Sequence, residues 1–224
     1  MNYNKNIFNK NFITNPVEIE RKSFEIIDGL LKDKKPLGKN ASIIQRVIHT
    51  TADFDYLENL VFSENVLEET INILKHGVNI VTDTQMVRAG VNKRVLEQLK
   101  SSVHCFIDSA EVSERAKITE TTRSASAMEF AVEHVADPLL FAIGNAPTAL
   151  IKLYEMITRG YCKPCLIIGV PVGFVNVTES KELIMELNIP FIVSRGRKGG
   201  SNVAAAIINA ILYETIKYKE NTNL

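Results

Sequence analysis

Short runs of consecutive apolar residues recur along the 224-residue chain, and segments with helical spacing separate them. Continuous apolar runs are typical of strands that are buried on both faces of a parallel sheet. Apolar residues at i, i+3, i+4 and i+7 indicate amphipathic helices. The alternation predicts a three-layer α/β/α fold with a mostly parallel, five-stranded, Rossmann-like sheet and N-terminal helices. The strands are expected at 78–82, 103–107, 139–143, 166–170 and 191–194.

Capping residues mark several helix ends. Asn15 is a candidate N-cap with Pro16 in the first turn, and Gly77 suits the end of a later helix. Residues 1–15 are rich in Asn and Lys, so we expect a flexible lead-in or an interface arm, followed by a single domain over 16–224. Helices are expected at 16–32, 42–53, 65–76, 92–100, 109–134, 148–159, 180–188 and 202–218, with a helical turn or loop at 83–90.

The charge balance limits the class of partner. The chain has 26 basic and 26 acidic residues, so its formal net charge is zero. This argues against a nucleic-acid partner held by a global basic field, but it allows a small anionic ligand. The apolar runs fall far short of the roughly 20 residues that span a membrane, and the N-terminus does not read as a secretory signal.

The cysteine usage favours a reducing compartment, and we expect a cytoplasmic protein. There are three Cys, and Cys162 and Cys165 have C-x-x-C spacing. The favoured interpretation is a turn followed by a strand-edge Cys; a redox pair or a zinc ligand pair is the less favoured alternative. His76, His104 and His134 lack metal-ligand spacing and are expected to be structural. No metal and no cofactor are therefore predicted.

Residues 42–53 carry the most informative pattern. Ile44, Val47, Ile48 and Thr51 form a core-facing stripe. Arg46, His49 and Asp53 fall at i, i+3 and i+7 on a polar side, which suits proton transfer to or from an anionic ligand. The alternative is a solvated helix face with an incidental histidine.

Unusual residues follow the predicted strands, at the edge where open α/β sheets bind ligands. The last of these loops joins Arg197 and Lys198 to glycines before a helix, which favours an anion; a flexible, solvated loop is the alternative. The G-x-G-x-x-G and Walker A spacings are absent, so a nucleotide-binding oxidoreductase is disfavoured. The loops are Asp83–Met86, Gly144–Thr148, Pro171–Val175 and Gly196–Ser201.

Several long blocks resemble the precorrin-8X methylmutase family of corrin biosynthesis, called cobalt-precorrin-8 methylmutase in the anaerobic branch. The resemblance covers about residues 16–215 in order. The blocks are Ile19–Phe24, Arg46–Asp53, Asp83–Gly90, Thr122–Ser124, Gly144–Leu150, Gly169–Val175 and Gly196–Ser201.

The resemblance implies an isomerase that moves a methyl group from C11 to C12 of a tetrapyrrole, without S-adenosylmethionine. The product would be hydrogenobyrinic acid or cobalt-containing cobyrinic acid. The family's proton-transferring histidine matches His49, its substrate contacts match Ser23 and Arg46, and a further arginine matches Arg123. The resemblance also implies a homodimer.

The chemistry of a tetrapyrrole substrate suggests further substrate-binding residues. Carboxylates favour arginine forks and helix N-termini, and the flat ring favours an apolar shelf such as Met86, Val172 and Phe174. A non-catalytic corrinoid carrier remains the alternative function. The predicted substrate-binding residues are Ser23, Arg46, Thr84, Met86, Arg123, Asn145, Thr148, Gly173 and Arg197, with His49 as the catalytic residue.

Overall fold

The computed structural model describes residues 12–32, 36 and 38–222, and the chain divides into two compact units, 1–35 and 36–224. The first unit contains helix α1 (Pro16–Leu31). The Asn15 side chain accepts hydrogen bonds from the backbone N–H groups of Val17 at 3.0 Å and Glu18 at 3.2 Å. The predicted N-cap and the proline in the first turn are thus confirmed. Of the predicted lead-in, residues 1–11 lie outside the described part of the chain.

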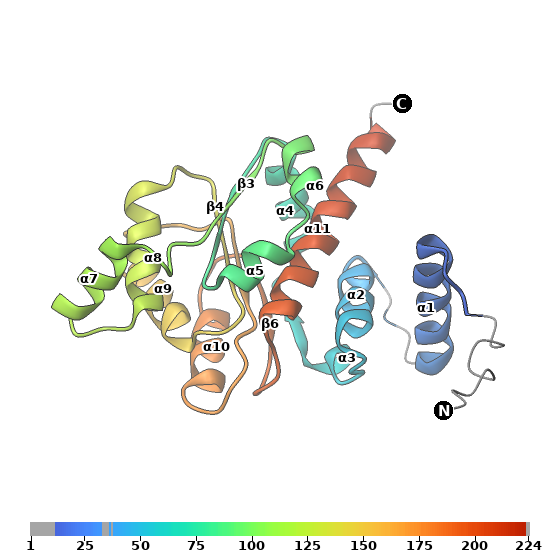
Figure 1. The fold of residues 1–224 in the computed structure, drawn as a ribbon, viewed down its shortest axis with the longest axis horizontal. Helices are drawn as coiled ribbons and strands as arrows, with labels where there is room; N and C mark the ends of the chain where they lie inside the picture. Colours follow the sequence, from blue (N-terminus) through green and yellow to red (C-terminus); the bar gives the residue numbers. More distant parts are fainter. Residues whose placement is uncertain (1–11, 33–35, 37, 223–224) are drawn as a thin grey trace, which may run out of the picture. The chain divides into compact units, whose positions relative to one another are not determined.

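The second unit is built on a six-stranded sheet in the order β1-β6-β5-β4-β2-β3 (Figure 1). The five predicted strands correspond to β2–β6 and run parallel, because each is followed by a helix that returns the chain to the starting edge. The strands are β1 (Leu60–Phe62), β2 (Asn79–Thr82), β3 (Ser102–His104), β4 (Leu139–Ile143), β5 (Leu166–Gly169) and β6 (Phe191–Ser194).

Helices cover both faces of this sheet (Figure 1). Helices α7 to α10 lie against one face, while α11, the longest, lies against the other with α2, α4, α5 and α6 around it. None of the helices in the described residues is long and apolar enough to cross a membrane. The helices are α2 (Ala41–Thr51), α3 (Tyr56–Asn59), α4 (Val66–Leu74), α5 (Gln85–Gly90), α6 (Lys93–Gln98), α7 (Ala110–Ile118), α8 (Arg123–His134), α9 (Pro147–Thr158), α10 (Val177–Met185) and α11 (Ser201–Thr222).

Alternate strand residues form separate cores on the two faces, because successive side chains of a strand point in opposite directions. Phe141 and Ile143 of β4 and Ile167 of β5 pack with Leu150 and Leu153 of α9. The intervening strand residues are also buried, and so is most of the first half of α11. Burial on both faces explains why these strands are continuous apolar runs.

The sequence pattern missed two features. Strand β1 has only three residues and pairs antiparallel with β6, with Leu60 opposite Ser194. A strand this short shows no recognisable periodicity. The helical region predicted over 109–134 is present but is divided into two helices, α7 and α8, and the pattern did not locate the break. Glu120 has a positive φ of 51°, and Thr122 caps α8 by accepting a hydrogen bond from the Ala125 N–H.

The order of the strands creates a switch point between β2 and β4. From β2 the chain first continues to β3 on one side, and later strands are added on the other side of β2. The loops that leave β2 and β4 therefore diverge at the carboxyl edge, which is where ligands bind in open α/β sheets.

Candidate functional site

Asp83 occupies the switch point. Its buried carboxylate accepts hydrogen bonds from the backbone N–H groups of Gly144 at 2.9 Å, Asn145 at 2.7 Å and Ala146 at 2.8 Å. Burial raises the pKa of Asp83, and the three N–H donors oppose that rise. The turn before α9 is thus an anion site, as expected for a helix N-terminus. Because Asp83 fills it from within the protein, a ligand carboxylate cannot use these N–H groups.

Hydroxyl pairs join the helix N-termini along the carboxyl edge. Thr84 caps α5 by accepting a hydrogen bond from the Val87 N–H, and its hydroxyl lies 2.9 Å from that of Ser201 at the start of α11. The Thr122 hydroxyl donates to the Thr148 hydroxyl of α9 at 2.8 Å. These contacts place the predicted residues Thr84 and Thr148 on one edge.

Arg123 and Asn145 lie at the same edge and are exposed. Arg123 is the first residue of α8, directly after Thr122, and Asn145 lies in the loop after β4. Both are next to residues that the hydroxyl pairs and Asp83 hold in place. A guanidinium and an amide are thus presented to solvent from a firmly bonded backbone.

Exposed apolar side chains project from helix α5 and from the loop after β5. Met86 is 69% exposed and Phe174 is 86% exposed, which is unusual for large apolar residues. The Arg197 guanidinium lies 5.9 Å from the centre of the Phe174 ring, and the Gly173 N–H donates to the Arg197 carbonyl at 3.2 Å. An apolar surface beside a cation suits a flat ring that carries carboxylates.

Helix α2 presents Arg46 and His49, but its structure corrects part of the predicted pattern. Val47 and Ile48 are buried as expected, whereas Ile43, outside the predicted stripe, is also buried and Ile44 is only half-buried. His49 is exposed in the last turn. The Arg46 guanidinium lies over the Tyr213 ring of α11, 4.9 Å from its centre.

Asp53 does not belong to the helical row that the spacing predicted. Helix α2 ends at Thr51, and Ala52 adopts a left-handed conformation with φ of 53°, which turns the chain away from the helix axis. The predicted i+7 relation to Arg46 is therefore wrong, because it requires the helix to continue to residue 53. Asp53 instead belongs to the junction between α2 and α3.

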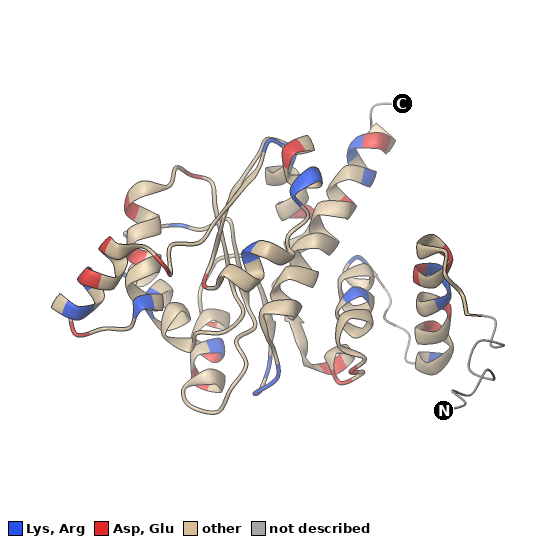
Figure 2. Ribbon diagram, viewed as in Figure 1, with Lys and Arg blue, Asp and Glu red and all other residues tan. Residues whose placement is uncertain are grey.

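Lys198 joins this junction to the loop between β6 and α11. Its Nζ lies 2.6 Å from a carboxylate oxygen of Asp53 and 2.6 Å from one of Asp55. Figure 2 shows the basic loop beside the acidic junction. We predicted Lys198 to favour an external anion, whereas this structure pairs it with two internal carboxylates. The α2–α3 junction is thereby tied to the loop that carries Arg197.

This ion pair predicts a pH-dependent effect of Lys198→Met on stability. The Lys198 hydrogen bond holds the pKa of Asp53 below its ordinary value of 3.8. A carboxyl with a depressed folded-state pKa stabilises the fold above its unfolded-state pKa and loses that contribution as the pH falls through the folded-state value. Lys198→Met should therefore lower the urea midpoint at neutral pH, and the difference from wild type should shrink at about pH 3 and below.

Lys217→Met is the matched control, because Lys217 pairs with Glu214 on the surface of α11 and makes no ion pair with Asp53 or Asp55. A difference between wild type and Lys198→Met that stays constant from neutral to acid pH would contradict the role given to Asp53.

Ser23 belongs to the first unit. Its hydroxyl donates to the Ile19 carbonyl at 2.7 Å within α1. The other predicted site residues belong to the second unit and gather at or beside the carboxyl edge, on α2, α5, α8 and α9 and in the loops after β4, β5 and β6.

The cysteines and remaining histidines have local roles. Burial raises the pKa values of the Cys162 and Cys165 thiols to about 11, so neither is an activated thiolate at neutral pH. His104 hydrogen-bonds the Ser102 hydroxyl at 2.6 Å, and His134 stacks on Phe130. Among the described residues, no group of three His, Cys, Asp or Glu side chains could hold a metal ion.

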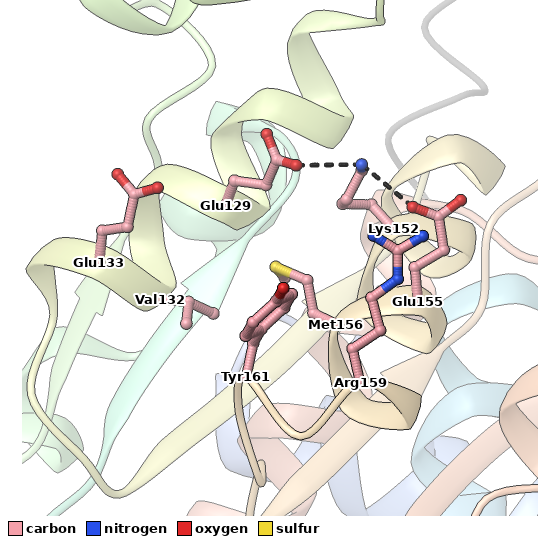
Figure 3. Close-up of a pocket in the computed structure, with 8 residues that line it drawn as sticks. All are labelled: Glu129, Val132, Glu133, Lys152, Glu155, Met156, Arg159 and Tyr161. Atoms are coloured by element: carbon pink, nitrogen blue, oxygen red, sulfur yellow. Dashed lines mark ion pairs between the residues drawn. The ribbon is translucent and has the colours of Figure 1, made fainter.

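Two partly open pockets lie elsewhere in the described part of the chain. One cavity of about 380 Å³ lies between α8 and α9, where Lys152 bridges Glu129 and Glu155 beside Tyr161 (Figure 3). Another is lined by residues of α4 and α11, including Leu67 and Tyr218. Neither contains a predicted site residue. The candidate site is instead the exposed carboxyl edge of the sheet together with the last turn of α2, which we call the rim.

Comparison with known proteins adds an independent finding. The family model CbiC, precorrin-8X methylmutase, matches residues 18–214. The chain is 43% identical over 209 residues to the cobalt-precorrin-8 methylmutase of Salmonella typhimurium, covering 90% of this chain and 97% of that protein. It is 40% identical over 171 residues to the precorrin-8X methylmutase of Pseudomonas aeruginosa, covering 75% and 81% respectively.

A solved structure agrees with these sequence matches. The crystal structure of the precorrin-8x methyl mutase from Thermus thermophilus superimposes with a TM-score of 0.80 at 34% identity. The match covers 89% of this chain and 98% of that chain, so it includes nearly the whole of the described fold.

Proposed function

Because the chain belongs to the precorrin-8X methylmutase family and is a methylmutase isomerase of corrin biosynthesis, we propose that it moves a methyl group from C11 to C12 of precorrin-8 or its cobalt form. The product is hydrogenobyrinic acid or cobalt-containing cobyrinic acid. The observation that supports the proposal for this chain is the carboxyl edge, where exposed Arg123 and Arg197 and the exposed side chains of Met86 and Phe174 lie on the segments that follow the strands. Exposed His49 is in the last turn of α2, and Lys198 ties the junction after that helix to the loop that carries Arg197.

His49 is the proposed proton donor and acceptor. Imidazole exchanges protons near neutral pH, and protonation of the conjugated macrocycle redistributes its electrons so that the methyl group can migrate. Donor and acceptor carbons belong to one molecule, so the atoms balance without a second substrate. The protein must also hold the ring in one tautomer and one conformation, because His49 has to meet a single ring position.

The other residues bind and orient the ring. Arg46, Arg123 and Arg197 pair with its peripheral carboxylates, since the backbone anion site before α9 is already filled by Asp83. Met86 and Phe174 contact the ring face, and the small Gly173 lets the ring approach the backbone. Ser23, Thr84, Asn145 and Thr148 supply hydrogen-bonding groups. We further propose that the enzyme acts as a cytoplasmic homodimer, in which a second copy shields the open rim from water.

The direct test is incubation of the purified protein with precorrin-8, and separately with cobalt-precorrin-8, followed by absorbance and mass spectrometry. An isomerase converts an excess of substrate to a product of unchanged mass and altered spectrum. A carrier shifts the spectrum only in proportion to the protein added. A stoichiometric shift with both substrates would reject the proposed reaction.

Arg46→Ala is expected to weaken corrinoid binding. Loss of one arginine–carboxylate contact removes about 1.5–3 kcal/mol, or roughly a tenfold or greater increase in Kd. Spectrophotometric titration with hydrogenobyrinic acid measures this change. Arg94→Ala is the control, because Arg94 is an exposed arginine of α6 that the proposal does not use. Equal affinities of wild type and Arg46→Ala would remove Arg46 from the binding site.

A further inference from the structure

Lys181 is a fully buried lysine that the proposed mechanism does not use. It lies in α10, and its Nζ donates to the Gly196 carbonyl at 2.7 Å and to the Lys198 carbonyl at 2.9 Å. Burial lowers its pKa to about 8, the direction expected for a cation removed from water. Both of these hydrogen bonds are to backbone carbonyls of one loop.

That loop is the one that carries Arg197. The two carbonyls bound by Lys181 flank Arg197 on either side, and the Arg197 carbonyl itself accepts from the Gly173 N–H at 3.2 Å. Three consecutive carbonyls therefore each receive a donor from outside the loop. The Ser194 hydroxyl adds a second donor to the Lys198 carbonyl at 2.7 Å.

The loop also packs closely against the backbone of Val170, at the end of β5. The Gly200 N–H donates to the Val170 carbonyl at 2.9 Å, and a Cβ on Gly199 would overlap that same carbonyl oxygen. The backbone from Gly196 to Gly200 is thus fixed by contacts that do not involve the Arg197 side chain.

Burying an ammonium group costs more free energy than burying an apolar side chain of the same volume. Well-packed apolar side chains of similar volume are often as stabilising as buried charges, because a charge loses its hydration. An ammonium supplies what an apolar side chain cannot, namely several directed donors at one point. The buried position of Lys181 therefore indicates that the protein needs the β6–α11 loop to be held in one conformation.

We propose that Lys181 is a positioning residue for the methylmutase reaction, acting through the β6–α11 loop to hold Arg197 where it binds a carboxylate of the corrinoid. This inference rests on the proposed function. Lys181 is fully buried and presents no surface to a ligand, so we expect its effect on binding to pass through Arg197.

A double-mutant cycle tests this route. KM and kcat are measured for wild type, Lys181→Met, Arg197→Ala and the double variant. We expect Lys181→Met to raise KM about tenfold with a smaller change in kcat, the effect of one lost charge-assisted contact. In the Arg197→Ala background the same substitution should change KM less than about twofold, because the contact it positions is already absent. Equal changes in both backgrounds would overturn the proposal.

Two further variants serve as a substitute and as a control in this experiment. If Lys181→Met does not fold, Ser194→Ala replaces it, since it removes the other donor to the Lys198 carbonyl and should give a smaller change with the same dependence on Arg197. Lys152→Met is the control for loss of a lysine, because Lys152 pairs with Glu129 and Glu155 on the α8–α9 surface. It should leave KM unchanged.

Hydrogen–deuterium exchange of residues 195–200 gives a readout that needs no substrate. Lys181→Met should speed exchange in this segment, and unchanged exchange would overturn the positioning role. If wild type fails to convert either substrate, the proposed function fails. If wild type converts substrate but the effects of Lys181→Met and Arg197→Ala multiply, only the role of Lys181 fails.

Discussion

His49→Ala should lower kcat by about 10²–10⁴-fold while leaving the Kd for hydrogenobyrinic acid within a few fold of wild type, because a general acid–base group typically contributes a factor of this size. Binding should persist because the arginines and the apolar shelf are untouched. Single-turnover absorbance measures the chemical step, and titration with the product measures affinity. The fold should tolerate the change, since His49 is exposed in the last turn of α2.

His76→Ala is the matched control. His76 is also an exposed histidine at a helix end, but it precedes β2 and so lies at the amino edge of the sheet, opposite the candidate site. We expect it to leave both kcat and affinity unchanged. Wild-type turnover by His49→Ala would exclude His49 as the proton-transferring group, whatever the effect on binding.

Asp83→Ala should produce the largest loss of stability. Asp83 is 1% exposed and accepts three backbone hydrogen bonds, so its removal leaves three N–H groups without their acceptor. A buried unsatisfied donor costs about 1–3 kcal/mol, so the free energy of unfolding should fall by about 3 kcal/mol or more. Urea denaturation followed by circular dichroism measures this change.

Asp108→Ala provides the comparison for loss of an aspartate. Asp108 is exposed in the loop after β3, and such surface substitutions usually change stability by less than about 0.5 kcal/mol. If Asp83→Ala were as stable as Asp108→Ala, the carboxylate could not be the group that holds the turn before α9.

The sequence predicts the parallel strands and much of the rim for the same physical reason. Strands buried on both faces must be continuous apolar runs, so the polar residues that follow them mark the carboxyl edge. This argument predicts that four residues lie in the ligand-binding region, and the structure places their segments at that edge. They are Thr84, Asn145, Thr148 and Arg197. Their contacts with substrate remain predictions.

The contacts that tie the rim together could not be predicted. Lys198 pairs with carboxylates 145 and 143 positions away in the sequence, and Asp83 binds N–H groups about sixty positions away. The spacing of residues within one helix or strand contains no information on partners so distant in the sequence. Lys181 gave no signal either, because a lysine on a predicted helix is ordinarily solvated, and only the packed structure shows that this one is buried.

Residues 52–59 connect the helix that carries His49 to strand β1, and the antiparallel pairing of β1 with β6 fixes one end of this segment. Leu60 is in register with Ser194, and the Arg195 N–H donates to the Asn59 carbonyl at 2.7 Å, so this end of the segment is locked to the strand that leads into the Arg197 loop. The other end is the last turn of α2. Adding or deleting a residue between 52 and 59 would shift the imidazole against the guanidinium by up to about 3.6 Å. The number of residues in this segment therefore sets the distance between His49, the proposed proton donor, and the loop that carries Arg197.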